Sequence, residues 1–145
     1  MDAIKNGYEL IYGGWLVSGN WIGELDFLEI NKTVKSNLGN WSYEIIDTKN
    51  TSKVKGDHIY QLSLYSFLLE EAQGIFPKNF YVLLKDKSKV PIMLNNVYAS
   101  FLKQKNYFEI FMENELNRKI LEKISHCTLR DIQEFCENEW KEKKC

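Results

Sequence analysis

The chain has 145 residues, 44% of them apolar and 27% charged, and this size and composition predict one domain with a substantial core. Its 19 basic and 20 acidic residues give a formal charge of −1, which excludes the uniformly positive surface of a histone-like coat but not an enzyme that acts on nucleic acid. No apolar run is long enough to cross a bilayer and no signal peptide is visible, so we expect a soluble cytoplasmic protein without a membrane partner.

The first third of the chain is rich in aromatic and β-branched residues, which predict three strands in a meander. We expect these strands at about residues 8–18, 21–31 and 41–48. Gly19-Asn20 is typical of a tight hairpin turn between the first two strands, and residues 31–40 predict a longer polar loop.

The remainder of the chain predicts helices alternating with strands. Asp57 can cap a helix that runs to about Gln73, and Gly74 with Pro77 ends it. One or two further strands are expected, at residues 79–84 alone or at 79–84 and 90–94, and two further helices at residues 97–124 and 129–143. This order predicts an α/β fold with a mixed central β-sheet flanked by helices and a helical C-terminal segment.

Three charged residues stand within or at the ends of the predicted strands. Asp26 interrupts the apolar centre of the second strand, where an unpaired carboxylate costs several kcal/mol. Asp47 and Lys49 are two residues apart, so strand alternation directs both to one face. Two carboxylates can hold a divalent cation with water and phosphate oxygens, and a lysine beside them can orient that water or offset developing charge.

Simpler explanations of these three residues stay open from the sequence. Asp47 and Lys49 would also form a surface ion pair, and Asp26 would also serve as the partner of a backbone amide or of Lys49. In the predicted helix, Gln61 and Tyr65 lie four residues apart and share one face. That pair could grip a nucleobase or a phosphate, or hydrogen-bond the strand ends.

Aromatic and basic residues near these positions fit two interpretations each. Trp15, Trp21 and Trp41 could stack on exposed bases or fill a core. Lys53 and Lys55, which follow Lys49, could meet phosphates or lie on a solvated loop.

Taken in chain order, Gly23-x-x-Asp26, Asp47-x-Lys49 and Gln61-x-x-x-Tyr65 resemble the RecB-type branch of the PD-(D/E)XK nuclease superfamily. The similarity to prokaryotic RecB-like nucleases covers roughly residues 3–112 and includes the runs Gly23-Glu-Leu-Asp-Phe-Leu28 and Tyr43-Glu-Ile-Ile-Asp-Thr-Lys49. It implies a single domain with a restriction-endonuclease-like core, a mixed four-stranded sheet between helices, and a helical tail over about residues 113–145.

The resemblance also implies an activity, the Mg²⁺- or Mn²⁺-dependent cleavage of DNA. Asp26, Asp47 and the backbone carbonyl of Thr48 would then be metal ligands, and Lys49 would position or activate the attacking water. Gln61 and Tyr65 would match the helix motif of the RecB branch and help to position the DNA.

The sequence departs from the family pattern at both ends. Only residues 1–7 precede the first strand, where the family has a helix that supports the metal site. A partner chain could supply that helix; alternatively, the chain is a catalytically reduced module that binds DNA or a partner protein without cleavage. An iron–sulfur cluster is not expected, because it needs four thiolates and the chain has Cys127, Cys136 and Cys145, whose spacing on a helix is about 13.5 Å.

Overall fold

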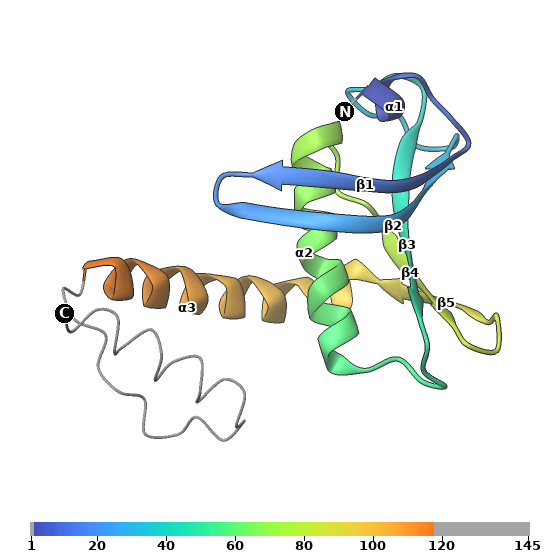
Figure 1. Ribbon diagram of the computed structural model, residues 1–145. Helices are drawn as coiled ribbons and strands as arrows, with labels where there is room; N and C mark the ends of the chain where they lie inside the picture. The colour runs from blue at the N-terminus through green and yellow to red at the C-terminus, as the bar shows by residue number, and fades with distance from the viewer. Residues whose placement is uncertain (1, 118–145) are drawn as a thin grey trace, which may run out of the picture. The chain divides into compact units, whose positions relative to one another are not determined.

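The computed structural model describes residues 2–117, which form an α/β fold with an open, mixed sheet (Figure 1). The chain divides into two compact units, Met1–Tyr107 and Phe108–Cys145, and the strands found among the described residues all belong to the first. Over the described residues, none of the helices combines the length and the hydrophobicity that a membrane crossing requires.

The sheet has five strands in the order β1-β2-β3-β4-β5, so each strand pairs with its neighbour in the sequence. Only β3 and β4 are parallel, because the helix α2 connects them as a crossover, and the other pairs are antiparallel. The bounds are β1 Leu10–Ser18, β2 Trp21–Asn31, β3 Ser42–Lys49, β4 Asn79–Leu84 and β5 Lys89–Met93. The predicted strands are therefore confirmed with small shifts at their ends, and of the one or two strands expected after α2 the structure has two.

The turn chemistry of the first hairpin agrees with its sequence. Ser18 pairs with Trp21, so Gly19 and Asn20 form a two-residue loop as predicted. Gly19 has a φ of 56°, which a II′ turn requires at its first central position and which glycine adopts without steric cost. At the other edge of the sheet, β5 ends at Met93, and a 3₁₀ helix, η1 (Leu94–Asn96), follows it.

The helix α2 (Gly56–Gln73) covers the sheet and completes the core. Leu62 and Leu69 of this helix are fully buried with Tyr43 and Phe80 of the strands. Burial of an apolar side chain of this size contributes about 1.5–3 kcal/mol to the free energy of unfolding. In Figure 1 the hairpin of β1 and β2 crosses α2, while β3 and β4 run beside it.

The start of α2 differs from the prediction. Lys55, not Asp57, occupies the N-cap, and Asp57 lies in the first turn. The reason is that the buried side chain of His58 accepts a hydrogen bond from the Lys55 amide through Nδ1 at 3.1 Å, so this histidine satisfies the amide at the helix start. Gly74 ends the helix in the left-handed conformation, as predicted.

Two further helices complete the described chain. The short α1 (Asp2–Lys5) buries Ile4, whose carbonyl accepts a hydrogen bond from Trp41 Nε1 at 3.3 Å. The helix α3 (Tyr98–Asn117) lies within the predicted range of residues 97–124, and Tyr60 of α2 hydrogen-bonds Ser100 at its start. The remainder of that range, the helix predicted at residues 129–143 and the three cysteines lie outside the described residues.

A kink in the hairpin sets the position of the polar residues. Before it, Ile11 of β1 and Leu28 of β2 pair and pack on the core; beyond it, Leu16 and Gly23 pair and are buried against α2. Strict alternation cannot direct residues 11 and 16 to the same side, so both strands change their inward face between these pairs. The change falls where Gly13, with a φ of 64°, lies opposite Asp26 and the ladder skips one pair.

Candidate active site

The strands β2 and β3 separate at the candidate site. Their pairing runs from Asn31↔Ser42 to Phe27↔Ile46 and stops there. Beyond this point β2 pairs only with β1, and β3 pairs only with β4. The strands therefore form a fork, and Asp26 and Asp47 are the first residue of each strand inside it.

A side chain ties the two arms of the fork together. Asp26 Oδ2 accepts a hydrogen bond from the backbone amide of Thr48 at 2.7 Å and a second from Thr48 Oγ1 at 2.5 Å. The carboxylate thus takes the place of the ladder bond that β2 would otherwise supply. One alternative left open by the sequence, Asp26 as the partner of a backbone amide, is confirmed.

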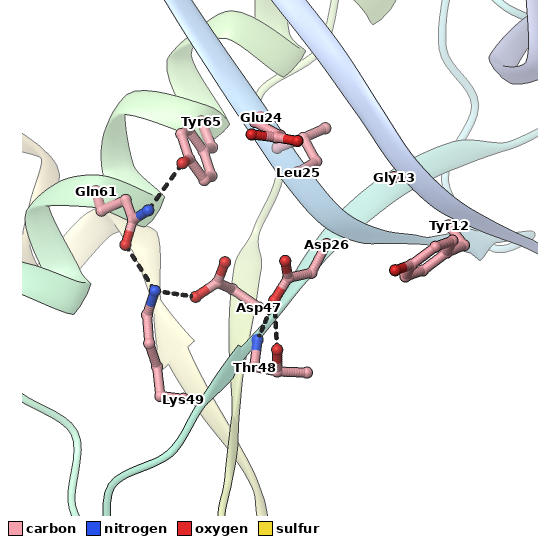
Figure 2. Close-up of a pocket in the computed structure, with 10 residues that line it drawn as sticks. All are labelled: Tyr12, Gly13, Glu24, Leu25, Asp26, Asp47, Thr48, Lys49, Gln61 and Tyr65. Atoms are coloured by element: carbon pink, nitrogen blue, oxygen red, sulfur yellow. Dashed lines mark hydrogen bonds and ion pairs between the residues drawn. The ribbon is translucent and has the colours of Figure 1, made fainter.

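Asp47 begins a chain of polar contacts that reaches the helix. Lys49 Nζ lies 2.6 Å from Asp47 Oδ2 and donates a hydrogen bond to Gln61 Oε1 at 2.7 Å. Gln61 Nε2 in turn donates to the Tyr65 hydroxyl at 2.8 Å. Figure 2 shows these contacts as one continuous path from α2 to β3. The side chains of Asp47 and Lys49 are only 5% and 19% exposed, so the alternative of a surface ion pair is wrong.

The Asp47 carboxylate is held in an unfavourable environment for its charge. Burial raises its pKa above the ordinary value of 3.8, the nearby charge of Asp26 raises it further, and Lys49 offsets only part of these effects. Its Oδ2 atom is buried, and the Lys49 ammonium contacts it at 2.6 Å. Two adjacent carboxylates, whose charge one ammonium only partly balances, favour the binding of a cation.

The two aspartates open onto a cavity with a volume of about 490 Å³. It is lined from three strands and from α2, by Tyr12, Gly13, Glu24, Leu25, Asp26, Asp47, Thr48, Lys49, Gln61 and Tyr65. In Figure 2, one oxygen of each aspartate is reached by a drawn contact and the other is not. All the site residues predicted from the sequence therefore lie at one cavity.

Gly23 allows the helix to come close to the hairpin at this cavity. A Cβ atom at this position would lie 2.6 Å from Cδ1 and 2.8 Å from Cε1 of Tyr65, far inside normal contact distance. The absence of a side chain at Gly23 thus lets the Tyr65 ring lie against β2, where its hydroxyl reaches Gln61.

Four residues of the cavity wall were not predicted as site residues: Tyr12, Gly13, Glu24 and Leu25. The sequence held a signal for the first two. A two-residue loop at Gly19-Asn20 fixes the hairpin register and places Gly13 opposite Asp26.

Of the three tryptophans that could stack on bases or fill a core, Trp21 and Trp41 pack on the core, whereas Trp15 is 59% exposed.

The donor set of the site consists of oxygen atoms. Among residues 2–117, no group of three or more histidine, cysteine, aspartate or glutamate side chains could hold a metal ion. A cation at this site would therefore take two carboxylates from the protein, with water or substrate oxygens among its other ligands.

Comparison with known proteins gives no further indication of function. No protein-family model matches the chain, and a search of curated proteins found no match either.

Proposed function

We propose that the protein is a metal-dependent nuclease that hydrolyses phosphodiester bonds in DNA and belongs to the RecB-like branch of the PD-(D/E)XK superfamily. The observation that carries this proposal is that Asp26, Asp47 and Lys49 meet at one cavity, at the fork between β2 and β3. The mixed sheet with α2 on it agrees with a restriction-endonuclease-like core, although five strands are present instead of four.

The residues at the fork fit Mg²⁺ or Mn²⁺. Hard divalent cations prefer oxygen ligands, and Mg²⁺ in particular keeps several waters and uses one or two carboxylates with substrate phosphates. Asp26, Asp47 and the carbonyl of Thr48 would hold the ion, and its charge would offset the repulsion between the two carboxylates. When bound, the ion would polarise the phosphate and lower the pKa of a coordinated water.

Lys49 is suited to act on the reacting phosphate. Its ammonium lies at the cavity and is held from two sides, by Asp47 and by Gln61, so its position is fixed before a substrate enters. A fixed positive charge stabilises the negative charge that develops as water attacks phosphorus, without reorganisation during the reaction. Gln61 and Tyr65 are positioning residues in this account, since they act through Lys49.

A cleavage assay on single- and double-stranded DNA, with Mn²⁺ or with EDTA, tests this proposal. We expect cleavage by the wild type only with the divalent ion, and its loss in Lys49→Ala and Asp47→Ala. Lys35→Ala is the matched control, because Lys35 is exposed and does not line the cavity, and it should cleave like the wild type. Cleavage retained in both site variants would refute the mechanism.

Titration calorimetry with Mn²⁺ separates the nuclease from the module that binds without cleavage. The nuclease should bind the ion, and Asp26→Asn should bind it far more weakly, because the variant lacks one of two carboxylates. DNA binding without Mn²⁺ binding or cleavage would instead favour the reduced module.

A further inference from the structure

We propose that the site takes an unpaired DNA strand, whose bases stack on Tyr12 and Trp15 beside the cavity. This inference rests on the proposed function, because it names the form of the substrate for the same site. The observation behind this inference is that two aromatic side chains of β1 are exposed, Tyr12 in the cavity wall and Trp15, which pairs with Glu24 of that wall.

Tyr12 forms part of the cavity wall and yet remains open to solvent. It is 80% exposed, more than any other large hydrophobic side chain among the described residues. Its ring rests against Phe27 with 5.3 Å between centroids, so one side is supported while most of the ring is accessible. Figure 2 shows Tyr12 and Tyr65 on opposite sides of the two aspartates.

Trp15 extends this aromatic surface along the hairpin. It is 59% exposed and pairs in register with Glu24, another residue of the cavity wall. Because Leu16 is buried against α2, alternation turns Trp15 to the outer face. Exposed aromatic rings next to a polar cavity are typical of a binding surface, and every base offers a face on which such rings stack.

Positive charge lies on the chain segments that lead away from Lys49. Residues 49–57 and 85–89 carry six lysines and two aspartates, in a chain whose net charge is −1. The two segments are neighbours, since the Lys85 amide donates a hydrogen bond to the Thr51 carbonyl. Five of these lysines are exposed, namely Lys53, Lys55, Lys85, Lys87 and Lys89, and Lys89 forms an ion pair with Glu29. They match the phosphates of a strand that continues beyond the cavity.

The depth of the carboxylates favours a single strand over a duplex. Asp47 is only 3% exposed, so a phosphate must enter the cavity to approach it. An unpaired strand is flexible enough to turn a phosphate inward and a base outward, whereas a duplex keeps its bases stacked on each other and unavailable to Tyr12.

Fluorescence anisotropy of the 145-residue chain in EDTA tests this inference, with labelled oligothymidylate and a hairpin duplex as probes. We expect tighter binding of the single strand, and a loss of about 5- to 150-fold in Tyr12→Ala or Trp15→Ala, the equivalent of one lost stacking contact. Tyr12→Phe keeps the ring and should retain the affinity. Tyr107→Ala removes a tyrosine that is 61% exposed away from the cavity, and it should bind like the wild type.

The lysines provide a second measurement. Lys53→Ala should reduce the slope of log affinity against log salt by about 0.7, the value for one phosphate contact with a single strand. Equal affinity for the duplex, or unchanged binding by Tyr12→Ala and Trp15→Ala, would overturn the inference.

The outcome also separates this inference from the proposed function. Divalent-dependent cleavage with unchanged binding by Tyr12→Ala would support the nuclease and overturn the stacking surface. Binding that depends on Tyr12, without any cleavage, would support the stacking surface and overturn the nuclease.

Discussion

The contact between Gly23 and Tyr65 allows a prediction with a magnitude. In Gly23→Ala the new Cβ would lie 2.6 Å from the ring, so the ring must move by about 0.8 Å to reach an ordinary contact of 3.4 Å. Both groups are buried, and overpacking of a buried contact costs about 1–3 kcal/mol. Because the Tyr65 hydroxyl also accepts the hydrogen bond from Gln61, the same shift should disturb Lys49 and reduce cleavage.

Gly14→Ala is the matched control for this variant. Gly14 lies in the same hairpin and a Cβ there meets no atom within 4 Å, so alanine should be neutral or stabilise by about 0.4–1 kcal/mol. Urea unfolding measures both free energies, and we expect Gly23→Ala to be less stable than Gly14→Ala by about 1–4 kcal/mol. Equal midpoints for the two variants would refute the close packing of α2 on β2.

Three further predictions concern the charged network. Burial raises the pKa of Asp47, so ionisation of this carboxyl in EDTA should lower the free energy of unfolding as the pH rises above 3.8. Urea unfolding at several pH values should therefore show a smaller decrease for Asp47→Asn than for the wild type, and equal decreases would contradict this. Mn²⁺ at a hundred times its Kd should raise the free energy of unfolding of the wild type, measured by thermal unfolding, by about 2.7 kcal/mol and should not change that of Asp47→Asn. An equal effect on both proteins would mean that the ion binds elsewhere. Tyr65→Phe removes the acceptor of the Gln61 hydrogen bond, which contributes about 0.5–1.5 kcal/mol. This variant should cleave DNA more slowly while its circular dichroism spectrum stays unchanged, and a wild-type cleavage rate would exclude Tyr65 as a positioning residue.

The parts of the fold that follow from local rules could be predicted from the sequence. Alternation placed Asp47 and Lys49 on one face, and helical spacing did the same for Gln61 and Tyr65. The structure joins these two pairs through a single hydrogen bond between Lys49 and Gln61. Turn residues likewise marked the hairpin at Gly19 and the helix end at Gly74.

The features that local rules miss depend on tertiary contacts. The kink at Gly13 cannot be predicted from alternation, because both strands change their inward face there. Asp57 is a typical capping residue, but the buried His58 stabilises an earlier start of α2. Ser63 and Ser66 are fully buried, since each hydroxyl bonds the carbonyl of the previous turn, at Ile59 and Leu62, and small side chains suit a helix close to a sheet.

The double role of Asp26 couples the architecture of the sheet to ligand occupancy. The carboxylate that faces the cavity is also the group that joins β2 to the Thr48 amide, so the spacing of the two arms depends on its charge and on what it binds. A ligand that binds this carboxylate should change the length of its hydrogen bonds with Thr48, and with it the separation of β2 and β3. Hydrogen exchange at a single backbone position, the Thr48 amide, would therefore report directly on events in the cavity.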